Sequence, residues 1–333
     1  MMTGIGYTLM TEQSGPRALV EHAAAAERTG FDFAVMSDHY FPWLSPQGHA
    51  PYAWSVLGAV TQVTSDIELM TYVTAPIMRY HPAVVAQKAA TIGLLAGDRF
   101  LLGIGAGENL NEHVIGHGWP PVNVRHEMLA EAIEIISELF EGGDVDYLGR
   151  HYRVDSARLW DLPDRRVPVG TAVSGPQSIR RFAAASDAMI AVAPDARLCE
   201  SWDRASNTTG DRKIGQLPIC WDPDRDAAVA RAHEQFSWFA GGWKVNAELP
   251  VPEAFAAATK YVRPEDVASA IPCGPEVGPI VDAVSSFRRA GFTDVALVQI
   301  GVDSDPTGFF EFAGGELLPA LRSAAAGRVS GEA

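Results

Sequence analysis

Residues 99–112, RFLLGIGAGENLNE, decide the fold class of this chain of 333 residues. Arg99–Ile104 is a short apolar run, typical of a strand that is buried on both faces. Glycines and polar residues follow it directly, and helical periodicity then covers about 124–140. A buried strand that ends in a polar loop and leads into a helix is one unit of a parallel α/β sheet.

The same unit recurs along the chain. Strands are predicted at Ile5–Leu9, Phe31–Met36, Asp66–Val73, Arg99–Ile104, Val167–Val173, Ala188–Val192, Lys213–Cys220 and Asp294–Ile300. Helices are predicted over Pro16–Arg28, 82–96, about 124–140, about 176–186, 277–290 and about 307–322. Eight strands alternating with helices favour a closed (β/α)8 TIM barrel over an open doubly wound sheet.

The pattern predicts a single barrel domain over residues 1–322. Two stretches, 38–65 and 236–265, exceed ordinary loop lengths, so we expect both as insertions over the C-terminal mouth of the barrel. Residues 323–333 are small and polar, and we expect them to be a disordered tail.

Composition excludes several classes of protein. With 26 Lys and Arg against 41 Asp and Glu, the net charge is −15, which argues against a nucleic-acid binder and against a protein held on anionic lipid. No apolar run is long enough to span a membrane, and no signal peptide is visible. Three cysteines without a CxxC motif indicate a reducing compartment. We therefore expect a cytoplasmic protein.

Polar residues just after the strands are the site candidates, because barrel enzymes place their chemistry there. His39 can take or give a proton near neutral pH, or it can simply hydrogen-bond its own loop. Glu108 follows glycines that let the backbone approach a flat ring, and its carboxyl can hydrogen-bond a ring nitrogen; the alternative is a solvated carboxylate. Ser174 and Gly175 offer donors for a phosphate, or a plain helix cap.

Other motifs are absent. The spacing Gly103-x-Gly105-x-Gly107 differs from the dinucleotide fingerprint GxGxxG. His113 and His117 do not form an HExxH motif, so no metal site is expected. There is no GxSxG elbow, which gives little support to a serine hydrolase.

Several segments together resemble the luciferase-like barrel superfamily (LLM class), in the branch of coenzyme F420-dependent oxidoreductases. The likeness is greatest to the F420-dependent glucose-6-phosphate dehydrogenase group and runs from about residue 4 to 192. The segments that carry it are Glu12-Gln13, Ser37-Asp38-His39 with Phe41-Pro42-Trp43, Gly48-His49-Ala50-Pro51, Arg79-Tyr80-His81-Pro82-Ala83-Val84, Gly103–Glu112, Gly149–Val154 and Ser174-Gly175-Pro176.

The resemblance implies an enzyme that moves a hydride between the deazaflavin coenzyme F420 and a small organic substrate, an alcohol or carbonyl or a conjugated double bond. It implies that His39 is the base, that Glu108 donates to the ring nitrogen, and that Trp43 and Glu12 hold the substrate. A non-proline cis peptide is expected at Tyr72-Val73, and a homodimer is expected. The implied cofactor-binding residues are Asp38, Tyr72, Val73, Thr74, Ala75, Gly107, Asn111, Ser174, Gly175, Gln177 and Ser178.

Two departures bear on the substrate. Sugar-phosphate members of the group carry a Lys after the sixth strand, whereas this chain has Asp195, which would repel a phosphate. Glucose-6-phosphate is therefore not the expected substrate. Aromatic residues in 236–262 either belong to the core or line an apolar mouth. Two alternatives stay open: an FMN-dependent monooxygenase of the same fold, and a barrel that only binds a ligand.

Overall fold

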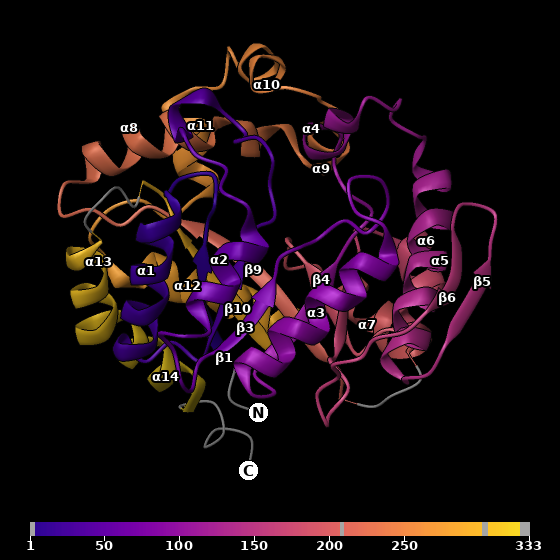
Figure 1. Cartoon of the computed structure of the whole chain (residues 1–333). Helices are drawn as coiled ribbons and strands as arrows, with labels where there is room; N and C mark the ends of the chain where they lie inside the picture. The colour runs from indigo at the N-terminus through magenta and orange to yellow at the C-terminus, as the bar shows by residue number, and fades with distance from the viewer. Residues whose placement is uncertain (1–3, 207–209, 302–305, 327–333) are drawn as a thin grey trace.

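A closed barrel of eight parallel strands forms the centre of the computed structural model, which describes residues 4–206, 210–301 and 306–326 (Figure 1). The barrel strands are β1 (Gly4–Leu9), β2 (Phe33–Met36), β3 (Glu68–Thr71), β4 (Phe100–Ile104), β7 (Val169–Ala172), β8 (Ala188–Ala191), β9 (Arg212–Ile219) and β10 (Asp294–Gln299). They follow one another around the barrel in this order, and β10 pairs with β1 to close it. The prediction of a (β/α)8 barrel is confirmed.

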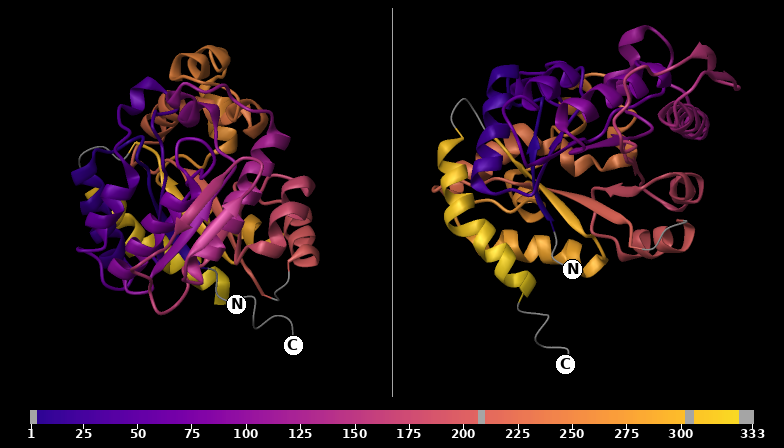
Figure 2. Two further views of the ribbon diagram at one scale, coloured as in Figure 1. Left: turned by 45° about the vertical axis from the view of Figure 1, so that its right-hand side comes forward. Right: turned by 60° about the horizontal axis from the view of Figure 1, so that its bottom comes forward.

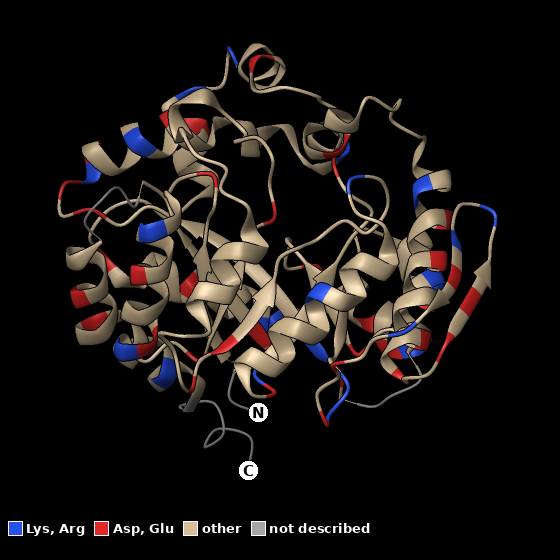
Figure 3. Ribbon diagram, in the orientation of Figure 1, with Lys and Arg blue, Asp and Glu red and all other residues tan. Residues whose placement is uncertain are grey.

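Helices surround the strands, as both views in Figure 2 show. The α-helices are α1 (Pro16–Thr29), α2 (Ala53–Val60), α3 (Pro82–Ala96), α4 (Asn109–Glu112), α5 (Val122–Phe140), α6 (Pro176–Phe182), α7 (Ala196–Ala205), α8 (Arg225–Phe236), α9 (Trp243–Asn246), α10 (Pro252–Ala258), α11 (Pro264–Ala270), α12 (Val277–Ala290), α13 (Thr307–Phe312) and α14 (Leu318–Ala326). Charged residues lie mainly on these helices and on the loops, and few lie on the barrel strands (Figure 3).

Residue choice explains the helix ends. α1 begins at Pro16, where a missing N–H costs nothing, and is capped after Thr29 by Gly30, whose φ of 96° suits a glycine. α3 repeats the pattern with Pro82 and with Gly97 at φ 60°. The barrel interior is filled by apolar side chains of the strands, among them Phe33, whose ring fits against β1 because Gly6 has no Cβ.

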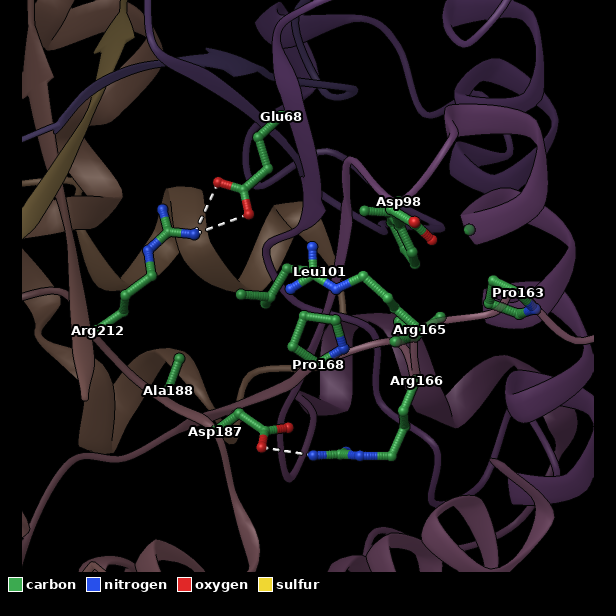
Figure 4. Close-up of a pocket in the computed structure, with 13 residues that line it drawn as sticks. Glu68, Asp98, Leu101, Pro163, Arg165, Arg166, Pro168, Asp187, Ala188 and Arg212 are labelled. Atoms are coloured by element: carbon green, nitrogen blue, oxygen red, sulfur yellow. Dashed lines mark hydrogen bonds and ion pairs between the residues drawn. The ribbon is translucent and has the colours of Figure 1, made fainter. Parts of the chain in front are cut away.

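The N-terminal end of the barrel is closed by ion pairs (Figure 4). There, Arg212 of β9 donates two hydrogen bonds to Glu68 of β3, at 2.7 and 2.8 Å, and another to Asp294 of β10 at 3.2 Å. Arg166 pairs with Asp187 at 2.6 Å beside a hollow of about 280 Å³. We expect these ion pairs to contribute to stability and not to catalysis, since barrel enzymes place their chemistry at the opposite end.

The structure adds elements that the sequence patterns did not predict. An antiparallel hairpin, β5 (Val145–Leu148) with β6 (Arg153–Ala157), follows α5. The last predicted helix, 307–322, is interrupted by a π-helical segment at Ala313–Leu317 and continues to Ala326. Residues 323–326 of the predicted tail are therefore helical, and residues 327–333 lie outside the described part of the chain.

Candidate active site

The predicted site residues gather on one side of the C-terminal mouth. They follow β1, β2, β3, β4 and β7, which are successive neighbours around the barrel. Strand order therefore brings together loops that lie up to about half the chain apart in sequence, and the site can be built from the side-chain contacts among them.

His39, Glu12 and Trp43 form a buried, hydrogen-bonded group. His39 Nδ1 lies 3.1 Å from the carbonyl oxygen of Phe41 and 3.5 Å from Glu12 Oε1. Both partners are acceptors, so Nδ1 carries the ring proton, and Nε2 is left with its lone pair. Nε2 makes no hydrogen bond to the part of the chain that the structure describes. The imidazole is thus held in the tautomer that a general base requires.

Glu12 is placed by donors from two loops. The indole nitrogen of Trp43 donates to Oε1 at 3.0 Å, while the hydroxyls of Thr11 and Ser37 donate to Oε2. Glu12 and His39 are 1% and 8% exposed. The resemblance assigned Trp43 and Glu12 to the substrate; in this structure they contact each other and His39, and their role toward a substrate stays a prediction.

Asp38 is the centre of a second network. Its Oδ2 accepts from Thr74 Oγ1 at 2.7 Å and from Trp54 Nε1 at 3.2 Å, and its Oδ1 accepts from Arg79 at 3.1 Å and Tyr80 at 3.2 Å. Four donors match the acceptor capacity of one carboxylate. Asp38 therefore joins the loops after β2 and β3, and a direct contact with a cofactor stays a prediction.

Glu112 supports the same network from α4, the short helix that follows β4. Its Oε2 accepts from the Arg79 backbone N–H at 2.7 Å, and Oε1 lies 3.5 Å from Arg79 Nε. Burial raises the pKa of Glu112 to about 7, against the opposing effect of the Arg79 charge. One guanidinium thus bridges two buried carboxylates, those of Asp38 and Glu112.

Glu108 and Asn111 connect the β4 loop to the β2 loop. Asn111 donates to Glu108 Oε2 at 2.9 Å, and its own Oδ1 accepts from the backbone N–H groups of Tyr40 and Phe41 at 2.8 and 3.4 Å. The Asn111 side chain therefore positions Tyr40 and Phe41, which directly follow His39. Glu108 is half-buried and follows Gly107, whose φ of 70° favours glycine.

At the C-terminal end of the barrel interior lies a layer of apolar side chains, the apolar layer. Val73 and Ala172 are partly buried there beside Gly105, where an added Cβ would lie 2.8 Å from Val73 Cγ2. A flat ring can lie on such a surface, which a larger side chain at residue 105 would disturb. The Tyr72-Val73 peptide is cis, so this prediction from the resemblance is confirmed. Thr74 and Ala75, which follow it, are buried.

The segment after β7 carries several polar side chains. Ser174 and Gln177 are exposed, and Ser178 turns its hydroxyl toward the carbonyl of Gly175 at 2.9 Å. This segment lies across the apolar layer from His39, since β3 and β4 separate β2 from β7 in the barrel.

A cap formed by residues 236–262 contacts the site. Trp238 stacks on Trp43 with the ring centres 4.1 Å apart and the planes 8° apart, and Phe255 packs edge-on against Trp43 at 5.2 Å. Asn109 Nδ2 donates to the Glu248 carbonyl at 2.9 Å, and Arg125 pairs with the Glu248 carboxylate at 3.0 Å. Figure 1 shows the cap helices α9 and α10 beyond this end of the strands.

The aromatic residues of the cap are thus mainly packing residues. Phe236 and Phe255 are buried in an apolar cluster with Trp43, whereas Trp243 and Tyr261 are exposed. The sequence left open whether these rings form core or line the mouth, and the contacts favour core for the first group.

Sequence reasoning gave no role to several residues that the site uses. Arg79, Tyr80 and Trp54 hold Asp38, and Trp238 holds Trp43. Arg79 and Tyr80 follow β3 closely, so their place after a strand was the signal that could have found them. Among the described residues, no group of three or more His, Cys, Asp or Glu side chains is arranged to hold a metal ion.

Fold and site define a barrel with a buried histidine–carboxylate pair and apolar side chains at its C-terminal mouth. The chain belongs to the family described as luciferase-like monooxygenase, whose model matches residues 1–294. None of the helices in the described residues is both long and apolar enough to cross a membrane.

Known proteins resemble the chain over nearly its whole length. It is 34% identical to an F420-dependent glucose-6-phosphate dehydrogenase of Beutenbergia cavernae, over 97% of this chain and 98% of that protein. It is 33% identical to an F420-dependent hydroxymycolic acid dehydrogenase of Mycobacterium tuberculosis, over 96% and 88% of the two chains. A solved F420-dependent secondary alcohol dehydrogenase, in complex with an F420-acetone adduct, superimposes with a TM-score of 0.87 at 27% identity, covering 96% and 99%.

Proposed function

We propose that the chain is an oxidoreductase that moves a hydride between coenzyme F420 and a small alcohol or carbonyl substrate. The observation that carries this proposal is the buried Glu12–His39 pair, which leaves His39 Nε2 as the acceptor at the barrel mouth. The relatives support the coenzyme, because their names specify F420.

The residues present fit a deazaflavin. Val73, Gly105 and Ala172 give the apolar surface that a flat ring needs, and the exposed Ser174 and Gln177 supply polar groups to one side of it. When bound, the coenzyme supplies a ring carbon that accepts or gives a hydride. Glu108 is the candidate donor to the ring nitrogen, as the resemblance implies.

The protein's own part is proton transfer. His39 takes the hydroxyl proton of an alcohol at Nε2 when the substrate is oxidised, and returns it in the reverse direction. Glu12 lies beside Nδ1 and stabilises the imidazolium that results. Trp43, covered by Trp238, excludes water from Glu12 and fixes its orientation.

We propose further that glucose-6-phosphate is a poor substrate, unlike the substrate named for several relatives. Asp195 follows β8 and is exposed, and its carboxylate caps α7 by accepting from the Arg197 N–H at 2.9 Å. A phosphate dianion near this carboxylate would be repelled, at the place where sugar-phosphate members of the group carry a Lys as the charged donor. Losing one or two charge-assisted hydrogen bonds, each about 1.5–3 kcal/mol, weakens binding tenfold to several thousandfold.

The test is a titration of the purified protein with coenzyme F420, FMN and NADPH, followed by turnover with secondary alcohols and with glucose-6-phosphate. Quenching of deazaflavin fluorescence and turnover of a secondary alcohol are expected. Micromolar affinity for FMN with no response to F420 would contradict the proposal and favour the monooxygenase alternative. Efficient turnover at micromolar glucose-6-phosphate would refute the substrate argument.

We propose further that the protein is a cytoplasmic homodimer. The cysteines Cys199, Cys220 and Cys273 are free thiols, as suits a reducing compartment. α3 exposes Val84, Leu94 and Leu95, each by 45% or more, and an apolar outer helix face supports association with a second copy. Light scattering after gel filtration should give twice the mass of one chain, and replacing Leu94 and Leu95 by Lys should give a monomer.

A further inference from the structure

Glu112, the last residue of α4, is a buried carboxylate to which the proposed proton transfer gives no role. Its side chain is 0% exposed, and it packs below Gly107, where an added Cβ would lie 3.2 Å from Glu112 Cγ. The Glu112 backbone N–H donates to the carbonyl oxygen of Glu108 at 3.2 Å, which closes the single turn of α4. Glu112 therefore packs against the segment that carries Glu108.

The Glu112 carboxylate also holds the segment that follows β3. Its Oε2 accepts from the Arg79 backbone N–H at 2.7 Å, and its Oε1 lies 3.5 Å from Arg79 Nε. The Arg79 guanidinium continues to the β2 loop, where Nη2 donates to the carbonyl oxygen and to Oδ1 of Asp38, at 2.8 and 3.1 Å. One carboxylate thus joins the loops after β3 and β4 and, through Arg79, the loop after β2.

The two oxygens of Glu112 make different contacts. Oε2 accepts a short hydrogen bond, whereas Oε1 and Arg79 Nε are both buried and have no hydrogen-bond partner among the described residues. At 3.5 Å these two atoms attract each other as charges, and the attraction lasts only while the carboxylate is ionised. An amide that kept the Oε2 contact would turn its NH₂ group toward Nε, which is itself a donor. The orientation of the guanidinium therefore depends on the charge of Glu112.

The surroundings of Glu112 bring its change of charge close to neutral pH. Burial raises the pKa of Glu112 to about 7; the Arg79 charge opposes this, and the charges of Asp38 and Glu108 add to it. Tyr152 of β6 also lies within electrostatic reach of Glu112, and burial raises the pKa of its hydroxyl, which stays neutral in this range. Glu112 thus passes from neutral to ionised between about pH 6 and pH 8.

We propose that Glu112 is a positioning residue of the active site, whose ionised carboxylate aligns Arg79 with Asp38 and fixes the Glu108 segment. This inference rests on the proposed function, because it takes that active site as the place of reaction. The ionised form is the aligned form, so affinity for the coenzyme should increase as pH rises through about 7. Alignment has a cost in stability. Below pH 7 the folded chain holds a proton that the unfolded chain releases near 4.5, so the free energy of unfolding should decrease as pH rises between these values.

The experiment measures affinity for coenzyme F420 by titration calorimetry in wild type, in Glu112→Gln and in the control Glu27→Gln. Glu27 is matched, because its carboxylate also accepts from backbone N–H groups, those of residues 65–67, which precede β3 at the N-terminal end of the barrel. The quantity compared is the ratio of wild-type to variant affinity at one pH, so that titration of the coenzyme or of His39 cancels.

The ratio for Glu112→Gln should be about 1 at pH 6, where both side chains are neutral, and about 2–10 at pH 8, where only wild type is ionised. The ratio for Glu27→Gln should stay near 1 at both. Arg79→Lys is a second variant, because an ammonium lacks the planar fork that contacts both carboxylates. The ratio of wild-type affinity to that of Arg79→Lys should also rise with pH.

Melting temperatures without coenzyme give an independent readout. Wild type should melt progressively earlier than Glu112→Gln as pH rises from about 5 to 8, because only wild type gains a buried charge. A residue with a merely structural role would show this difference while the affinity ratio stayed constant, and that result would overturn the inference. A melting difference that does not change with pH would overturn it as well. Binding of F420 at a constant ratio thus refutes this inference alone, whereas no binding by wild type refutes the proposed function and the inference with it.

Discussion

Replacing His39 by Ala tests the centre of the proposed mechanism. The change removes Nε2, the acceptor for the substrate proton, and leaves Glu12 and Trp43 bonded to each other at 3.0 Å. A positioned general base contributes about 10²–10⁴ in rate, so kcat should fall by that factor, which equals about 2.7–5.5 kcal/mol of barrier. The dissociation constant of the coenzyme should stay within a few-fold.

The cost in stability should be small. Among the described residues His39 makes one hydrogen bond, to the Phe41 carbonyl at 3.1 Å, and it lies 3.5 Å from Glu12 Oε1; a hydrogen bond of this kind contributes about 1 kcal/mol. His113 is the matched control, because its Nδ1 also contacts a backbone carbonyl, at 2.7 Å, and its ring stacks on Phe41. His113→Ala should therefore cost similar stability while kcat stays near that of wild type.

The assay follows the deazaflavin absorbance during turnover of a secondary alcohol, with melting temperature and coenzyme affinity measured on the same samples. If His39→Ala keeps near-normal kcat but melts early, His39 only supports its loop and the proposed role is wrong. If His113→Ala lowers kcat as much as His39→Ala, disturbance of the loop explains both effects, and Glu12 or Glu108 becomes the next candidate for the base.

Three further predictions concern the surroundings of the site and the core. Trp238→Leu removes a ring stacked 4.1 Å from Trp43, worth about 0.5–1.5 kcal/mol; kcat should fall less than in His39→Ala, and unchanged kcat would show that the cap does not position Glu12. Asp38→Asn leaves the buried Arg79 charge with a weaker partner; urea unfolding should show a loss of up to about 3–5 kcal/mol, and coenzyme affinity should weaken more than kcat. Burial lowers the pKa of His22 from 6.5 to about 4, so between these values the unfolded chain binds a proton that the folded chain does not. Stability should therefore decrease by about 3 kcal/mol as pH falls from neutral to about 4, and His22→Leu should remove this part of the pH dependence in urea titrations.

Buried strands were predictable because their apolar runs depend only on local sequence. All eight were found, with errors at the ends. The predicted third strand, Asp66–Val73, is longer than β3, since Glu27 Oε1 binds the backbone N–H groups of residues 65–67 and holds them outside the sheet. The hairpin β5–β6 was missed because its strands are short, contain Asp and are mostly exposed. The π-helical break coincides with Gly314 and Gly315, which weaken a helix.

From the sequence, the candidate site could be predicted only as a set of polar residues that follow buried strands. His39 and Glu108 stand after buried strands, which the sequence shows. The partners of Asp38 come from three separate segments, through Trp54, Thr74 and the Arg79–Tyr80 pair. Such convergence depends on barrel closure and not on spacing along the chain. The stack of Trp238 on Trp43 joins residues almost 200 positions apart and has no local signature.

That stack restricts how new substrate preferences can arise in this protein. Residues 236–262 are the natural segment to exchange when a barrel of this family is redesigned for another substrate, because they enter from a single insertion after α8. In this chain the same segment supplies the rings that bury Trp43, and Trp43 donates to the carboxylate beside His39. A chimaera that receives a foreign segment would therefore also disturb Trp43, Glu12 and His39, the proposed base, unless Trp238 and Phe255 are kept.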